Sequence, residues 1–146
     1  MANLTLTSAS VLQSSSAITL NGIAGVALGA GQPVYRDTAD LDSAGNAKWK
    51  LYDADAVTPV AILNGCQGIA ANSAAAGQPC TVVLSDPAFT HGLAAVTKGD
   101  IIIASATAGA LAPAADLAST MRPCVVMFAI SSTQATVDIA QSLTAK

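Results

Sequence analysis

Short apolar runs, each closed within a few residues by a turn signal, are the feature that most constrains how this chain can fold. The segments Lys48–Asp53 and Ala135–Gln141 alternate apolar and polar residues with a period of two, which is typical of strands with one buried face. Continuous apolar runs rich in β-branched residues predict core strands at 59–63, 81–84, 100–104 and 124–130. Helical periodicity is almost absent, so the sequence predicts an all-β protein.

Turn signals separate these runs at a density that suits a small β-barrel or β-sandwich of short strands. They stand at Asn21-Gly22, Asp42–Asn46, Asn64-Gly65, Asp86-Pro87, Lys98–Asp100 and Ala108-Gly109. The alanine-rich segments 69–78 and 112–121 are each bounded closely by Gly or Pro, so we expect at most one or two short helices.

The chain is expected to form one β-barrel domain, 17–146, preceded by an extended N-terminal arm, 1–16. The arm is rich in Ser and Thr and has no strong apolar face, so its order could depend on a partner.

The tetrapeptide AGQP occurs twice, at Ala30–Pro33 and at Ala76–Pro79, and each copy leads into an apolar run. Gly permits a positive φ, and Pro fixes its own φ and pushes the preceding Gln towards an extended conformation. The repeat therefore predicts two equivalent chain reversals that open strands, with Thr97–Ile101 as a third. A phosphate-binding loop would open a helix instead, so we interpret the repeat as scaffold.

Composition and charge exclude several classes of partner. Only 10% of the residues are charged while 52% are hydrophobic, which favours close packing against other protein. The net charge is −3 and the six basic residues are scattered, so neither nucleic acid nor an anionic membrane surface is an expected partner. The longest uncharged apolar stretch is too short and too interrupted to span a bilayer, and the N-terminus lacks the positive region of a secretory signal.

Residues that could perform chemistry are few. His91 is the only histidine, has no acidic neighbour in sequence and is expected to be a polar surface residue of a loop. Asp37, Asp40 and Asp42 lack the later Glu and fixed Gly of an EF-hand calcium loop, and a solvated loop is the simpler interpretation. Cys66, Cys80 and Cys124 fit neither a disulfide framework nor a metal pair and are expected to be core residues in a reducing compartment. We therefore expect no catalytic residue, no cofactor, no metal and no enzymatic activity.

The segment Thr97–Gln141 has a characteristic order of motifs. Gly-Asp opens a strand, an Ala-Gly turn leads to "LAPA", and "VVMFAIS" is followed by a final "TVDI" strand. The first half agrees in "GIAGVALGAGQPVYRD" and "AAGQPCTVVL". Over Ile18–Gln141 the chain resembles the capsid decoration (cement) proteins of tailed bacteriophages, the group with small SH3-like or tulip β-barrels.

This resemblance implies a mechanical role. Such proteins bind the outer face of the expanded capsid, commonly as trimers, and clamp neighbouring capsomers. The implied partners are the major capsid protein and further copies of this chain, and the implied location is the outer capsid surface of a virion made in the host cytoplasm. Another virion part, such as a tail, neck or head-fibre component, is the first alternative.

A module that binds a carbohydrate or a host surface is the second alternative, and exposure of Tyr35, Trp49 and Tyr52 in one patch would favour it. Phe128, by contrast, lies in a core-like run.

The candidate contact with the capsid or a neighbouring subunit is Leu4, Thr5, Leu6 and Thr7, whose alternation could add a strand to an exposed sheet edge. For packing between subunits the candidates are the Ala/Gly-rich segments Gly22–Gly31 and Ala70–Gly77, which could equally be buried strand and loop.

Overall fold

A computed structural model describes residues 3–55 and 65–142 of the chain. The predicted strand at 59–63 and the turn residue Asn64 lie outside the described residues. The strands are β1 (Ile18–Ile23), β2 (Pro33–Leu41), β3 (Ala47–Leu51), β4 (Gly68–Ala70), β5 (Pro79–Thr90), β6 (Ile101–Ala104), β7 (Leu111–Pro113), β8 (Cys124–Ala129) and β9 (Gln134–Gln141).

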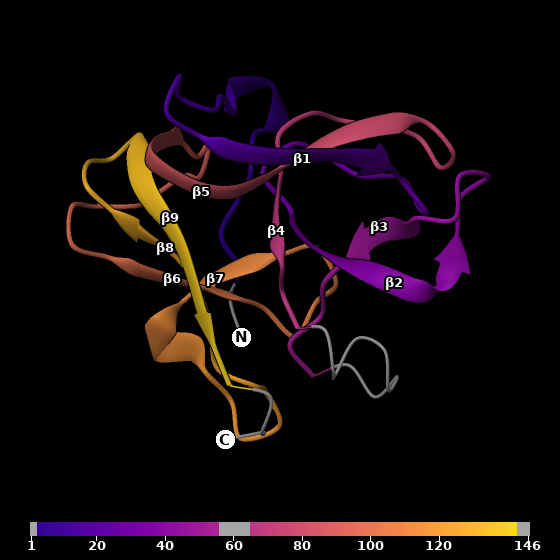
Figure 1. Cartoon of the computed structure of the whole chain (residues 1–146). Helices are drawn as coiled ribbons and strands as arrows, with labels where there is room; N and C mark the ends of the chain where they lie inside the picture. Colours follow the sequence, from indigo (N-terminus) through magenta and orange to yellow (C-terminus); the bar gives the residue numbers. More distant parts are fainter. Residues whose placement is uncertain (1–2, 56–64, 143–146) are drawn as a thin grey trace.

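The prediction of an all-β fold is confirmed. The strands form one curled antiparallel sheet, a half-barrel, in the order β3-β2-β4-β5-β9-β8-β6-β7, and β1 pairs in addition with residues 79–85 of β5 (Figure 1). Among the described residues the helical segments are two single 3₁₀ turns, Ser8–Ser10 and Ala114–Asp116. The second of these falls within the alanine-rich segment 112–121, whereas the other alanine-rich segment forms β4 and a turn.

Strand β4 and the first half of β5 form a central wall that is apolar on both faces. Ile69 of β4 pairs with Val83 of β5, and Ala70 pairs with Val82. Because successive side chains of a strand point to opposite faces, Ile69 and Val83 enter one hydrophobic core and Ala70 and Val82 enter another. Two-faced burial explains why these strands read as continuous apolar runs rather than as alternating ones.

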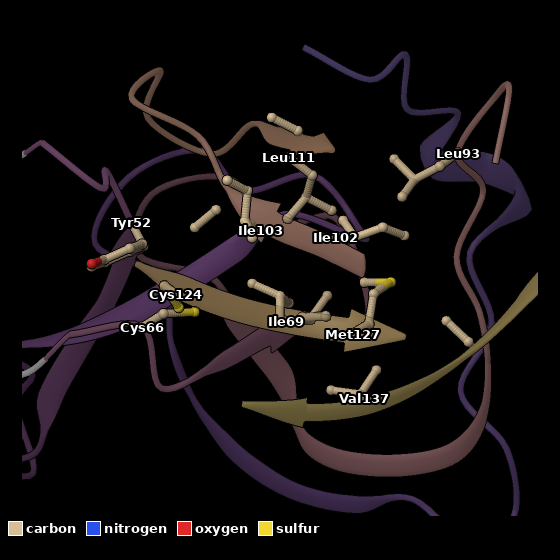
Figure 2. Packing of buried hydrophobic residues seen from close by; sticks show 14 of the residues in the cluster. Tyr52, Cys66, Ile69, Leu93, Ile102, Ile103, Leu111, Cys124, Met127 and Val137 are labelled. Atoms are coloured by element: carbon tan, nitrogen blue, oxygen red, sulfur yellow. The ribbon is translucent and has the colours of Figure 1, made fainter. Parts of the chain in front are cut away.

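The main core lies between the central wall and strands β6 to β9, and Figure 2 shows its packing. The second core is smaller and surrounds Trp49, whose side chain is 2% exposed. A parallel bridge between Ala24 and Trp49 brings the end of β1 to β3 and closes the second core. A Cβ at Gly22 would lie 2.6 Å from the Trp49 Nε1 atom, so the absence of a side chain there lets β1 pass over the indole.

The two AGQP copies form the same turn, as predicted. In the first, the Gly29 N–H donates to Gln32 Oε1 at 2.7 Å and the Gln32 N–H donates to the Gly29 carbonyl at 3.2 Å. The same two bonds join Ala75 and Gln78, at 2.9 and 3.0 Å. In each turn the Gly before the Gln has a positive φ, and the strand starts at the Pro.

The third predicted turn follows the same rule with Asp in place of Gln. The Thr97 N–H donates to Asp100 Oδ2 at 2.9 Å, and the Asp100 N–H donates to the Thr97 carbonyl at 3.1 Å before β6 begins. The repeated sequence is thus a repeated strand-opening turn, closed by its own side chain.

Two predicted turns are wrong. Asn21-Gly22 lies inside β1, and Asp86-Pro87 lies inside β5, where the register with β9 shifts between Asp86 and Phe89. Tertiary pairing therefore overrides both local signals, the second by absorbing Pro87 into a β-bulge.

Phe128 is not a core residue, contrary to the expectation. The register of β8 against β9 shifts between Val125 and Met127, and Val126 and Met127 are both buried. This irregularity changes the phase of the alternation, so that Phe128 turns outward and is 40% exposed.

The described part of the arm, 3–16, docks on its own chain. The Leu4 N–H donates to the Leu111 carbonyl of β7, the Thr7 N–H donates to the Gly92 carbonyl, and Leu12 forms two backbone hydrogen bonds with Thr90 of β5. Leu4, Leu6 and Val11 pack against the main core. The arm therefore connects the edge strand β7 to β5 along the rim of the half-barrel (Figure 1).

Asp86 fixes the end of the arm. Its side chain is buried, and its carboxylate accepts hydrogen bonds from the Ser14 N–H at 2.7 Å, from the Ser14 hydroxyl and from the Ala88 N–H at 3.0 Å. A buried carboxylate is costly unless such donors surround it.

We expect Ser14→Ala to lower the free energy of unfolding by about 1.5 kcal/mol, because it removes one donor from a buried charge. Ser15→Ala, at an exposed neighbour on the same arm, is the matched control and should change stability by less than about 0.5 kcal/mol. Urea unfolding of both variants measures the difference. Equal stability of the two variants would mean that Asp86 does not anchor the arm.

Candidate functional site

The predicted contact residues Leu4, Thr5, Leu6 and Thr7 divide between two environments. Leu4 and Leu6 are half-buried against the main core, and Leu6 forms an antiparallel bridge with Leu93. Thr5 and Thr7 are exposed. Only the threonine face of this segment is therefore available to a partner in this conformation.

His91 is buried, contrary to the expectation of a surface residue. The side chain is 1% exposed, its Nδ1 accepts a hydrogen bond from the Leu93 N–H at 2.9 Å, and its Nε2 is buried without a hydrogen-bond partner in the described structure. Burial lowers the pKa of His91, and the backbone of Ser131 opposes that shift. The ring therefore favours the neutral form.

A hollow of about 240 Å³ lies beside His91. Its polar lining consists of hydroxyl side chains and backbone, including Thr7, Ser10, Thr90 and Thr133, and contains no carboxylate, amine or thiol. A Ser or Thr hydroxyl could serve as a nucleophile if it were hydrogen-bonded to the imidazole, but Nδ1 accepts the Leu93 N–H and Nε2 has no partner in the described structure. The geometry around His91 therefore suits packing better than catalysis.

The acidic residues of the β2–β3 hairpin are paired with lysines. Lys50 Nζ lies 2.7 Å from Asp37 Oδ2 and 3.1 Å from Asp40 Oδ2, and Lys48 Nζ lies 3.0 Å from Asp40 Oδ1. The hydrogen bond from Lys50 lowers the pKa of Asp37, and those from Lys48 and Lys50 lower the pKa of Asp40. Asp42 instead accepts the Ala44 and Asn46 N–H groups of the hairpin turn.

The described residues contain no group of three or more His, Cys or Asp side chains that could hold a metal ion.

Asp53 and Asp55 form a carboxyl pair that the sequence pattern did not identify. They follow β3, and their side chains are hydrogen-bonded to each other. Burial, followed by the hydrogen bond and charge of Asp55, raises the pKa of Asp53 to about 6, while Arg122 acts in the opposite direction. The only sequence signal for this pair is the spacing of two residues. In a strand this spacing places both side chains on one face of the sheet, whereas in a loop it does not determine whether they meet.

The aromatic side chains do not form a binding patch. Trp49 and Tyr52 are 2% and 1% exposed and lie in different cores, and Tyr35 is half-buried against the main core. The guanidinium of Arg36 covers the Trp49 ring at 5.6 Å from its centroid. The exposed patch of Tyr35, Trp49 and Tyr52 that would favour a carbohydrate-binding module is therefore not present.

An exposed apolar cluster lies on the outer side of β6 and β8. Ile101 of β6 pairs with Phe128 of β8, and Ile130 lies two residues further along the same face. The exposed fractions are 41%, 40% and 42%. We call Ile101, Phe128 and Ile130 the β6–β8 apolar surface. Beside Ile101 lies a hollow of about 290 Å³ lined mainly by small residues, including Gly99, Pro113, Ala114 and Ala115.

A second group of exposed apolar side chains lies on the arm and β1. Leu12 is 66% exposed, Ile18 is 61% exposed and Leu20 is 41% exposed. These residues lie along the outer edge of β5, opposite Thr90, Ser85 and Val82 respectively.

The Ala/Gly-rich segments Gly22–Gly31 and Ala70–Gly77, the candidates for packing between subunits, contact each other in part, whereas Ala27 and Ala75–Gly77 are exposed. Leu28 and Ala74 exchange two backbone hydrogen bonds, of 2.8 and 3.0 Å, and both side chains are buried in the second core. Leu28 and Ala74 are thus buried, and packing between subunits stays a prediction for the exposed residues of these segments.

Comparisons with known protein families, with characterised proteins and with solved structures gave no match to this chain. Among the described residues, no helix has the length and apolar character needed to cross a bilayer.

The carboxyl pair gives a pH-dependent prediction. Because the pKa of Asp53 is raised to about 6 in the folded protein, folding is favoured while Asp53 is protonated, and this contribution is lost as the pH rises from about 4 through 6. Asp53→Asn keeps a donor towards Asp55 without the charge. It should therefore be more stable than the parent protein at pH 7, by about 1 kcal/mol after allowance for solvent screening.

Thermal unfolding between pH 3.5 and pH 7.5 measures this difference, which should appear as a Tm about 3 °C higher at pH 7 and no difference at pH 3.5. A stability difference that is constant over this range would contradict the assignment of the raised pKa to Asp53.

Proposed function

We propose that this chain is a non-catalytic structural protein of a tailed-phage virion that decorates the outer face of the capsid and stabilises the shell by clamping neighbouring capsomers. The observation that carries the proposal is the β6–β8 apolar surface, in which exposed Ile101 of β6 pairs with exposed Phe128 of β8 and Ile130 follows the end of β8. Exposed apolar clusters of this kind are typical of protein–protein contact sites. The likeness of the sequence to capsid decoration proteins supplies the kind of partner, the major capsid protein.

A clamp requires more than one contact surface, and the molecule offers two. The β6–β8 apolar surface and the group Leu12, Ile18 and Leu20 belong to different elements, so two neighbouring proteins could be contacted at once. The exposed face of Thr5 and Thr7 remains the proposed arm contact. Association of several copies, with a trimer favoured, would multiply weak contacts into avidity.

The chemistry of the candidate sites supports a role without catalysis. In the hollow beside His91 no lining hydroxyl is hydrogen-bonded to the imidazole, and the carboxylates of Asp37 and Asp40 are paired with lysines. A protein that binds only the assembled shell stabilises it by mass action, and no chemical step is needed.

Copy number in native particles tests the proposal directly. We expect sedimented particles from a lysate of the source culture to contain this chain at a ratio near one-to-one with the major coat protein. We also expect the chain to dissociate before the shell breaks on heating. A few copies per particle would instead favour a tail, neck or head-fibre component, and absence from all large particles would refute a virion role.

The contact surface is tested on particles stripped of this chain. Phe128→Lys should weaken rebinding by about tenfold or more, because it places a charge in an apolar contact. Leu41→Lys changes a leucine that is 53% exposed in the β2–β3 hairpin and is the matched control. Both variants should unfold within a few degrees of the parent protein. Equal rebinding of the two variants would exclude the β6–β8 apolar surface as the contact.

The arm contact is examined in the same assay with the double variant Thr5→Glu and Thr7→Glu. These substitutions leave Leu4 and Leu6 in the core, so they change the exposed face of the arm without removing its packing. Deletion of the arm is less informative, because it would also remove the hydrogen bonds that join β7 to β5. Undiminished rebinding of the double variant would show that this face does not contact the shell.

A further inference from the structure

We propose that Cys66 and Cys124 are a latent disulfide site, which a small-molecule disulfide oxidises to an intramolecular cross-link across the main core. The two thiols lie side by side in Figure 2, below Tyr52, and the Cys124 side chain is hydrogen-bonded to that of Cys66. This inference does not depend on the proposed function.

The backbone around the pair brings the two cysteines to the same level of the sheet. Gln141 of β9 is the register partner of Cys124 of β8. The Gln141 side chain in turn accepts the Cys66 N–H through its Oε1 atom at 2.8 Å. Cys66, which precedes β4, is thereby fixed beside the start of β8, as a disulfide between segments far apart in sequence requires.

Cys80 provides an internal control. It is also a buried free thiol, but it lies in the second core, on the other side of the central wall from Cys66 and Cys124. Burial of Cys80 raises the pKa of its thiol, as burial and the hydrogen bond with Cys66 do for Cys124, so low acidity does not distinguish them. What distinguishes Cys66 and Cys124 from Cys80 is that each of the two has the sulfur of the other beside it.

The reaction is a thiol–disulfide exchange in two steps. One cysteine thiolate attacks a small disulfide, forms a mixed disulfide and releases one small thiol. The second cysteine then attacks the protein sulfur of the mixed disulfide, and the second small thiol leaves. The two cysteine protons pass to the two released thiols, so that two protein thiols are oxidised while one small disulfide is reduced.

Burial controls the rate of this exchange. Cys66 and Cys124 are 1% and 0% exposed, and the oxidant must reach one of them to form the mixed disulfide. Oxidation of the folded protein should therefore be slow and limited by opening of this end of the sheet, whereas oxidation during refolding should be fast. A disulfide that closes a long loop also restricts the unfolded chain, so the oxidised protein should unfold at a Tm about 10 °C higher.

The experiment is refolding from denaturant with oxidised glutathione, followed by alkylation of free thiols and mass spectrometry. We expect loss of two hydrogen atoms, one alkylated cysteine, and a cross-link between Cys66 and Cys124 that dithiothreitol reverses. The Cys80→Ala variant should form the same cross-link and leave no free thiol. The Cys124→Ala variant should form no intramolecular disulfide, although it retains two cysteines.

Three free thiols in a correctly refolded protein would overturn the proposal, because refolding gives the oxidant access that burial denies. A cross-link that disappears in Cys80→Ala would overturn it as well, because it would assign the reaction to a different pair. The near-ultraviolet circular dichroism of Trp49 and of the tyrosines verifies that each sample has refolded.

Discussion

The whole structure depends on the central wall, in which a single strand pair supplies side chains to two cores. Val82 and Val83 are neighbours in sequence, yet they stabilise different halves of the molecule. Full burial of a valine contributes about 1.5–3 kcal/mol, so these adjacent residues couple the two cores energetically. Close approach of β4 to β5 requires Gly68, where a Cβ would lie 2.3 Å from Val82 Cγ1. The two cores therefore share the strand pair β4–β5.

Local pattern was sufficient to predict β2, β3, β5, β6, β8 and β9 and the strand-opening turns, because these depend on residues close in sequence, but it did not predict β1, β4 or β7. The AGQP turn closes through its own Gln side chain, and no distant residue is needed. The predictions that were wrong involve pairing between strands. Phe128 faces outward because of an irregularity in β8, and Asp86-Pro87 continues a strand because β9 pairs on both sides of it. Such irregularities depend on the partner strand, and no signal within the run itself encodes them.

The candidate sites were harder to predict for the same reason. The sequence identified Leu4–Thr7 by alternation but could not show that the leucine face packs against the main core of the same chain. Asp53 and Asp55 are close in sequence, yet their interaction depends on the loop conformation and on burial at the end of β3. The β6–β8 apolar surface depends on the register of Ile101 with Phe128, and the pairing of Cys66 with Cys124 depends on Gln141. Each of these relations exists only after the sheet has curled.

The distribution of charged and exposed apolar side chains is consistent with the lattice contact that we propose. The described lysine–aspartate pairs are concentrated on the β2–β3 hairpin, whereas the exposed apolar side chains lie mainly on β1, β6 and β8. An apolar contact between uncharged surfaces is non-directional, and a single copy binds weakly through it. Specific binding therefore depends on several such contacts at a fixed spacing. On a shell, identical sites recur at fixed spacing, and each engaged contact raises the effective concentration of the next. For the proposed function, the anchoring of the arm by Asp86 would reduce the conformational entropy lost when the protein binds such a site.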